Sequence, residues 1–398
     1  MGLGIPVMPR LLKELLGSDY SGASTIFGLL LATEAAAILL FAPVMGLVSD
    51  SVGRRPVILL GLCGGVLIKL TLAKANAIWL LFIVQFVSGA TGGILVPARA
   101  YLADTLPPEK RAQGFAHMAA ALGSGMLLGP IIGGALGAVD ARLPYWVAGV
   151  VTAIDLIYGV LVLPESRRTA AVVQESLREV YRKAFTSYHW LLSRPAPFLR
   201  TLTALVLSDF GNGLSQSVWI FYLALKLHWS STQIGRVVAV IAVMMILTQA
   251  LLARVSLRKL GEYRTVVAGL TLQTLGYLVV GLADQTWQVY LGVAVGTVGS
   301  VANPCFQARL SRGVSATEQG RLQGAMLSLL APLAIVRPII ATALFHAFTL
   351  PGSPLYIPGV TYYVSAALAA IALLLMTRES IVGEALQVQE SLPRSSAR

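Results

Sequence analysis

Charged side chains are scarce in this chain of 398 residues: they make up 12% of it, whereas hydrophobic residues make up 56%. The mean hydropathy is +0.75, and about 25% charged residues would be typical of a soluble domain. Apolar runs of about 20 residues recur along the chain, and each is long enough to cross about 30 Å of hydrocarbon. The composition therefore excludes an ordinary soluble globular protein and predicts an all-α integral membrane fold.

Cysteine is almost absent. Cys63 and Cys305 both lie inside apolar runs, which argues against a disulfide framework and against a thiolate metal site. No apolar run carries His, Asp or Glu at metal-binding intervals, and the Gly-x-Ser-x-Gly motif of serine hydrolases does not occur. We therefore expect no enzyme activity, no bound metal and no cofactor.

Acidic residues are also few, 18 against 30 basic residues, which gives a net charge of +12. Such an excess can indicate a nucleic-acid partner, but the positions of the basic residues argue against one. Twenty of them lie in alternate loops and in the tail, at 50–56, 104–114, 164–200, 256–265, 309–322 and from Arg378 onward. The opposite loops hold only Arg10, Lys13, Lys74, Arg142 and Lys226. By the positive-inside rule the first set is cytoplasmic, so we expect a multi-pass protein of the inner (plasma) membrane with a cytoplasmic C-terminus and no nucleic-acid partner.

The apolar runs predict eleven membrane spans. They lie at about 24–49, 56–74, 77–104, 113–137, 145–163, 198–225, 232–256, 265–283, 286–310, 323–349 and 358–377. The first apolar piece, residues 1–9, is too short to cross a bilayer. The chain therefore divides into an N-terminal bundle at 1–163, a basic cytoplasmic linker at 164–197, a C-terminal bundle at 198–377 and a disordered cytoplasmic tail at 378–398.

Short sequence patterns recur about 208 residues apart, which indicates two halves of one design. Gly53 recurs as Gly261, and Pro130-Ile-Ile recurs as Pro338-Ile-Ile. Two halves with six spans each would need a twelfth span in addition to the eleven predicted. Applying the repeat offset backwards from the span at 198–225 places this twelfth span at about −10 to 17. The first helix is then truncated in this sequence. We expect the reading frame to extend upstream of Met1 by about 10 to 20 codons, with Asp or Glu one or two residues before Met1.

Two motifs, in this order, resemble those of a known family. Gly46-x-x-x-Asp50-x-x-Gly53-Arg54-Arg55 is similar to the cytoplasmic signature between helices 2 and 3 of the major facilitator superfamily. Gly125-x-x-x-Gly129-Pro130-x-x-Gly133-Gly134 resembles the helix 5 motif of the proton-coupled antiporters in that superfamily, and the loop from Tyr101 to Arg111 resembles its tetracycline-efflux branch. The resemblance covers nearly the whole chain. It implies two six-helix bundles around a central cavity, with transport by alternating access.

The motif at 46–55, called the inner turn below, has two interpretations. In one it is a solvated, positively charged loop that only fixes topology. In the other it is a latch: Asp50 accepts charge-assisted hydrogen bonds from Arg54 or from a neighbouring helix and locks the outward-facing state. The family resemblance favours the latch. The second-half copy keeps Gly261 but has Leu257 in place of the acid, so we expect any latch there to be weaker.

The glycines of the second motif share one helix face, because Gly125, Gly129, Gly133 and Gly137 recur every fourth residue. Small residues at this spacing allow close packing of helices in a membrane. Pro130 removes a backbone donor and, in a sharper interpretation, bends the helix at the cavity wall. Both interpretations can hold together.

Four charged residues lie near the middle of their spans: Glu34, Asp155, Asp209 and Arg337. Each costs about 2.5–3.5 kcal/mol at the bilayer centre unless it faces a wet cavity or a partner. We favour cavity or coupling roles over structural ion pairs, because acids and a base occur at one depth. Asp209, rather than Asp155, is the expected proton-coupling acid, since two glycines follow it in Ser-Asp-Phe-Gly-Asn-Gly. Arg337 occupies the position of Gly129 in the repeat, which suggests an anion-binding or counter-ion role.

The chain departs from the tetracycline exporters at three positions. Those exporters carry acids in helices 3 and 9 and an arginine in helix 4. Alignment of the flanking motifs places Ile68, Gln273 and Gln85 there. We therefore count Gln85 and Gln273 among the cavity candidates, as neutral side chains where the resemblance implies charge.

Together these patterns predict a secondary active transporter that works as a monomer in the lipid bilayer. The expected function is proton-coupled efflux of small amphiphilic compounds or drugs, so the expected partners are a small-molecule substrate and protons. Two alternatives stay open. One is a metabolite or organic-anion transporter that pairs its substrate with Arg337. The other is a transporter-like protein that binds its ligand without moving it across the membrane.

Overall fold

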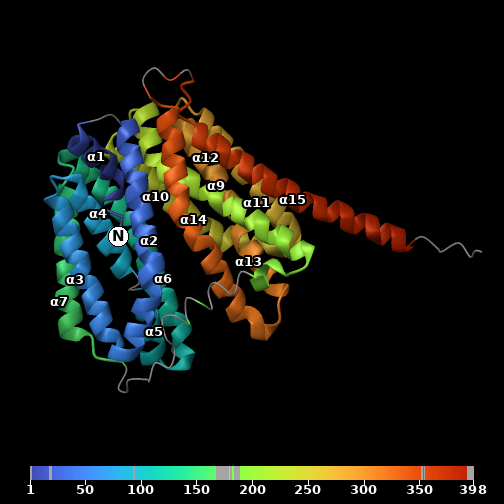
Figure 1. Cartoon of the computed structure of the whole chain (residues 1–398), viewed down its shortest axis with the longest axis horizontal. Helices are drawn as coiled ribbons and strands as arrows, with labels where there is room; N and C mark the ends of the chain where they lie inside the picture. The colour runs from blue at the N-terminus through green and yellow to red at the C-terminus, as the bar shows by residue number, and fades with distance from the viewer. Residues whose placement is uncertain are drawn as a thin grey trace, which may run out of the picture. The chain divides into compact units, whose positions relative to one another are not determined.

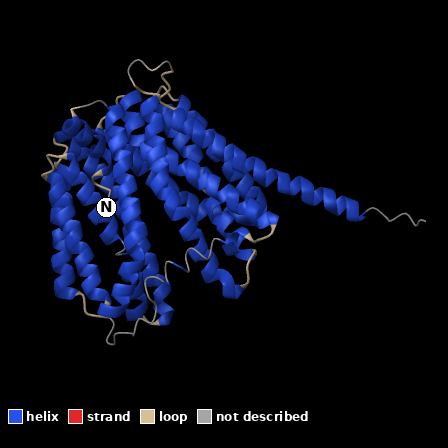
Figure 2. Ribbon diagram, viewed as in Figure 1, coloured by secondary structure: helices blue, strands red, loops and turns tan. Residues whose placement is uncertain are grey.

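The described part of the chain is almost entirely helical in the computed structural model (Figure 2). The structure describes residues 2–17, 20–92, 95–166, 189–350 and 355–391, together with Glu179, Arg182 and Ser353. No β-strand occurs among these residues. The predicted all-α membrane fold is therefore confirmed.

The helices follow the predicted spans closely (Figure 1). In the first part of the chain they are η1 (Ile5–Val7), α1 (Met8–Leu16), α2 (Tyr20–Val52), α3 (Arg54–Ala73), α4 (Ile78–Thr91), α5 (Leu95–Thr105), α6 (Pro108–Val139) and α7 (Leu143–Val162). In the second part they are α9 (Ala196–Lys226), α10 (Ser231–Leu247), α11 (Ala253–Leu282), α12 (Thr286–Gly299), α13 (Ala302–Arg312), α14 (Gln319–Ala347) and α15 (Val360–Ser391). A π-helical turn joins α10 to α11, and η4 (Ala316–Glu318) precedes α14.

Eight helical stretches among the described residues are long and apolar enough to cross a membrane. One of them, Ser231–Leu282, covers two predicted spans. Its backbone leaves helical geometry at Gly261 (φ 73°, ψ 174°), in the loop predicted between those spans. The predicted span at 77–104 is divided into α4 and α5. α9 is 31 residues long but is not one of these eight stretches, because polar residues in its middle lower its hydropathy.

The helices form two compact units. Unit 1 comprises Met1–Thr186, Gly213–Val243 and Leu327–Thr361, and unit 2 comprises Ser187–Asn212, Met244–Met326 and Tyr362–Arg398. α9, α10 and α14 therefore contribute to both units, and so do the first two residues of α15 with the rest of that helix. The domain boundaries expected at 163, 197 and 377 stay predictions. Within the expected linker, residues 167–178, 180, 181 and 183–188 lie outside the described residues, as do residues 392–398 of the expected tail.

Glycines allow close helix packing within each unit. In unit 1, α2 packs on α4, and a Cβ at Gly89 of α4 would overlap the carbonyl group of Glu34 in α2. In unit 2, α11 packs on α12, where Gly269 lies against Gly299. Such contacts let backbones approach where lipid gives no hydrophobic driving force. The positions at which helices end follow the same repeat. α4 ends just before Gly92, and α12 ends just before Ser300, which lies 208 residues further on.

Candidate functional site

The inner turn is a sharp change of direction at one glycine. α2 ends at Val52, Gly53 has a φ of +112°, and α3 begins at Arg54. This φ favours glycine, and a Cβ would also overlap the carboxylate of Glu165. That carboxylate accepts hydrogen bonds from the backbone N–H of Arg54 (3.0 Å) and of Arg55 (3.2 Å). Glu165 thus caps the N-terminus of α3, where free N–H groups and the helix dipole favour negative charge.

The arginine side chains of the inner turn extend its contacts to two further segments of unit 1. Arg54 is 13% exposed, and its Nε donates to Asp104 Oδ2 at the end of α5 (3.3 Å). Its Nη1 donates to the buried Oγ of Ser49 (3.0 Å). Arg55 donates from Nη2 to the carbonyl oxygen of Val160 in α7 (2.7 Å). The turn therefore joins α2, α3, α5 and the end of α7.

Part of the predicted latch lies outside the described side chains. Gly46 and Asp50 belong to α2, but the structure describes neither the surroundings of Gly46 nor the side chain of Asp50. The contact expected between Asp50 and Arg54 therefore stays a prediction. Sequence reasoning missed Glu165, which lies 111 residues after Arg54. The available signal was an acid directly after a span, in a linker that is otherwise strongly basic.

The glycine-rich motif of α6 is a packing surface. A Cβ at Gly133 would overlap the carbonyl oxygen of Leu3, and one at Gly137 would overlap Val7. On the neighbouring face, Gly134 lies against Ser231 at the start of α10, and Thr232 Oγ1 donates to its carbonyl oxygen (3.2 Å). These contacts support the close-packing interpretation. α6 runs through Pro130 as one helix that also contains Gly125 and Gly129, and the bend expected at Pro130 stays a prediction.

Replacing Gly133 with alanine should destabilise the protein by about 1–3 kcal/mol, the usual cost of overpacking a tight contact. The new methyl group meets backbone atoms of Leu3, so the N-terminal segment must move as a whole. Gly125→Ala is the matched control: the same substitution in the same helix meets nothing within 4 Å. Thermal unfolding in detergent should give a lower midpoint for Gly133→Ala alone. Equal midpoints for the two variants would contradict the contact.

Two of the candidate residues, Glu34 and Gln85, come together in unit 1. Glu34 of α2 accepts a hydrogen bond at Oε2 from Gln85 Nε2 (3.3 Å) and one at Oε1 from Ser88 Oγ (2.9 Å), both from α4. Neutral donors therefore hold both carboxylate oxygens. Ser88 was missed by sequence reasoning, because an isolated serine in an apolar run gives no signal. Glu34 and Gln85 were both identified from the sequence, but the hydrogen bond between them was not.

Two further mid-depth candidates, Asp209 and Arg337, lie on or beside α9. In unit 1, Gly213 lies against the side chain of Arg337 from α14, and a Cβ at Gly213 would overlap that side chain. In unit 2, Asp209 is partly buried in α9, and the preceding Ser208 donates to Oε1 of the buried Gln273 in α11 (3.0 Å). The glycines after Asp209 thus make room for neighbouring helices, as their small size suggests.

Asp155 has a different environment. It is exposed in α7, on the face that also carries Val151, Ile154 and Tyr158, which are 57%, 62% and 60% exposed. Large exposed apolar side chains suit contact with lipid. Within the described residues the structure does not bring Asp155 to another candidate. No group of three or more His, Cys, Asp or Glu residues suited to a metal ion lies among the described residues.

The end of the linker is attached to unit 2 by an ionic and aromatic cluster. Glu318 accepts hydrogen bonds from Arg194 Nη2 (2.7 Å) and from Trp190 Nε1 (3.3 Å). The guanidinium groups of Arg194 and Arg321 lie over the Trp190 ring, 4.1 and 4.8 Å from its centroid. The hydrogen bond from Arg194, with further ones from Ser315 and Trp190, lowers the pKa of Glu318 to about 2.

This cluster should release the linker only in strong acid. A carboxyl group whose pKa is lower in the folded state contributes stability above its unfolded pKa, here 4.5, and loses that contribution as the pH falls through about 2. In a variant that keeps Trp190 as its single tryptophan, the fluorescence should therefore change near pH 2. The change should be absent from Glu318→Gln. A transition centred near pH 4.5 would contradict the ion pair.

Comparisons with known proteins agree with the motifs. The family model described as Major Facilitator Superfamily matches residues 2–328 and, a second time, residues 201–393. The chain is 31% identical over 377 residues to the tetracycline resistance protein, class C, of Escherichia coli, which covers 94% of this chain and 91% of that protein. It is 32% identical over 354 residues to the class G protein of Vibrio anguillarum, covering 87% of each. The solved structure of the nucleoside transporter NupG is similar in fold, with a TM-score of 0.74 at 12% identity over 95% of both chains.

Proposed function

Since the chain belongs to the major facilitator superfamily, we propose that it is a secondary active transporter that exports small amphiphilic, drug-like molecules across the inner (plasma) membrane in exchange for protons. The observation that carries this proposal is the alignment to the class C tetracycline resistance protein at 31% identity over 91% of that protein. A match of that extent covers both halves of the chain, the inner turn and the glycine-rich motif of α6.

Carboxyl groups inside the membrane helices supply the proton sites in this proposal. A charged carboxylate there is costly, and it becomes neutral when it takes up a proton. Glu34 suits this exchange, since the hydrogen bonds from Gln85 and Ser88 come from neutral groups. Asp209 is the coupling acid, and its place in α9 beside the Ser208–Gln273 hydrogen bond supports a polar environment.

Arg337 supplies the positive charge among the residues that we propose to act in transport. Its side chain lies against Gly213, at a position where α9 carries no side chain. Its charge pairs with a carboxylate of the protein when the substrate is neutral or cationic, and with the substrate itself when the substrate is an anion. The substrate class can therefore be read from competition between anionic and cationic compounds.

Sealed inverted vesicles test the proposal. Tetracycline or a fluorescent amphiphilic cation is added outside, and a pH gradient, acid inside, is imposed. We expect uphill accumulation that collapses when a protonophore is added. Binding without accumulation would identify a binding protein instead. Accumulation that ignores the pH gradient and is blocked by organic anions would identify an anion transporter.

A further inference from the structure

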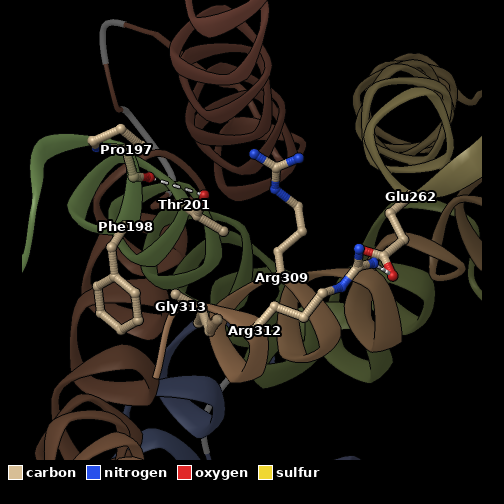
Figure 3. Close-up of a pocket in the computed structure, with 8 residues that line it drawn as sticks. Pro197, Phe198, Thr201, Glu262, Arg309, Arg312 and Gly313 are labelled. Atoms are coloured by element: carbon tan, nitrogen blue, oxygen red, sulfur yellow. Dashed lines mark hydrogen bonds and ion pairs between the residues drawn. The ribbon is translucent and has the colours of Figure 1, made fainter. Parts of the chain in front are cut away.

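The second half of the chain has its own ion pair at the position of the Arg54–Asp104 pair. In unit 2, Arg312 Nη2 contacts Glu262 Oε1 (Figure 3). Glu262 lies 208 residues after Arg54, and Arg312 lies 208 residues after Asp104. Both partners therefore occupy equivalent repeat positions, but the acid and the base have exchanged places. Four charged residues, in a chain of which only 12% is charged, thus stand at equivalent positions of the repeat.

The backbone around the two pairs is also equivalent. Gly261 precedes Glu262 and has a φ of +73°, as Gly53 precedes Arg54 with a φ of +112°. Each pair joins the helix that starts after its glycine to the end of a short helix that packs on it: α3 with α5, and α11 with α13. In each pair the residue after the glycine is the less exposed one, at 13% against 37% in unit 1 and at 21% against 68% in unit 2.

The exchange of charges has a physical consequence at the helix ends. Glu262 stands at the start of a helical segment and Arg312 is the last residue of α13, so both have the sign that their helix dipole favours. In unit 1 both signs are unfavourable, because Arg54 starts α3 and Asp104 lies in the last turn of α5. There a third group, the Glu165 carboxylate, caps α3. In unit 2 the paired acid itself can stabilise its helix start.

Figure 3 shows how the pair borders a cavity of about 270 Å³ between α9, α11 and α13. Arg312 reaches across to Glu262, whereas Arg309 points away from the pair. Pro197, Phe198 and Thr201 of α9 form the opposite wall. At the edge of this cavity the ion pair adds a direct polar link between α11 and α13, which also pack on each other elsewhere along their lengths.

We propose that Glu262 and Arg312 are positioning residues that hold the segment of α11 after Gly261 to the end of α13 throughout transport, as the charge-exchanged counterpart of the Arg54–Asp104 pair. This inference rests on the proposed transport function. It revises the expectation of a weaker second latch: the acid at position 257 is missing, but an acid stands at position 262. Because α11 and α13 belong to one compact unit, the pair stays closed while substrate moves.

Charge variants test the pairing. Glu262→Gln and Arg312→Gln should each lower the maximal efflux rate about two- to fivefold, the range expected for a partly exposed pair, with an unchanged half-saturating substrate concentration. The exchanged double variant, Glu262→Arg with Arg312→Glu, should be faster than either single variant. It should remain below the unmodified protein, because both charges then oppose their helix dipoles. Single variants with normal rates, or an exchanged variant no faster than they are, would overturn the proposal.

Cross-linking tests whether the pair stays closed. In a background with Cys63 and Cys305 replaced by alanine, Glu262→Cys and Arg312→Cys are joined by a short rigid bismaleimide, and mass spectrometry measures the yield. Cross-linked protein should export at the rate of its unlinked form. Blocked export would show that the pair must open, which overturns the proposal.

A readout without substrate separates this proposal from the transport function. If the unmodified protein moves no substrate, the transport proposal fails, but thermal unfolding of the single and double glutamine variants still measures coupling between the two residues. Non-additive midpoints would support the ion pair. Additive midpoints would reject it.

Discussion

Replacing Arg54 with alanine should slow efflux about ten- to a hundredfold, a change of about 1.4–2.8 kcal/mol, while substrate binding stays near normal. Arg54 donates to Asp104 and to the buried Ser49, and its loss leaves the Ser49 hydroxyl and the Asp104 carboxylate without this partner. The variant alters the balance between conformations rather than the cavity. Asp50→Asn, in the same inner turn, should have a similar effect.

Efflux from vesicles and equilibrium binding of the same substrate measure the two quantities separately. Lys110→Ala is the matched control, since it removes an exposed basic residue from the same set of loops. If the inner turn only fixed topology, Lys110→Ala and Arg54→Ala would act alike. Normal flux in Arg54→Ala would reject the latch.

Replacing Asp209 with asparagine should abolish uphill efflux and leave downhill exchange of substrate. Asparagine keeps the size and polarity of the side chain, but it cannot take up and release a proton. With the coupling acid gone, a pH gradient no longer drives transport, although the conformational change itself remains possible. The expected loss is complete for accumulation, and less than about tenfold, or 1.4 kcal/mol, for exchange.

Asp155→Asn provides the comparison for this variant, because it removes the same charge from a span whose exposed face is apolar. Accumulation with and without a pH gradient should distinguish the two. If Asp209→Asn still accumulates substrate with protons, the assignment is wrong. The same assay on Glu34→Gln then measures the contribution of the carboxylate that Gln85 and Ser88 hold.

Local patterns predicted the helices and the inner turn. Hydrophobic runs place helices wherever the chain must cross lipid, and Gly53 followed by two arginines gives a clear local signal. Contacts between distant residues gave no such signal. Glu165 caps α3 although it lies 111 residues further along the chain. Ser88 meets Glu34 only because α4 packs on α2. Only the tertiary structure brings these groups together.

The Glu262–Arg312 ion pair is another contact that the sequence patterns could not predict. Comparison of the halves by residue identity finds Gly261 but cannot recognise Glu262 as the counterpart of Arg54, since the two residues have opposite charge. Their equivalence lies in the geometry: a glycine with positive φ, a helix start and a partner at the end of the neighbouring helix. The N-terminal segment is a further example, because nothing in residues 2–7 indicates that Leu3 and Val7 lie on Gly133 and Gly137.

The contact of α6 with α10 has a mechanical consequence. A Cβ at Gly134 would overlap Ser231, and one at Gly235 would overlap the carbonyl group of Pro130, so backbone meets backbone here. Ordinary helix pairs interlock through side-chain ridges that fit into grooves, and sliding them requires rotamers to change. This contact has almost no ridges. α6 and α10 are held here by direct backbone contact and by the hydrogen bond from Thr232 to Gly134, so a methyl group added at Gly134 or Gly235 would push the two helices apart.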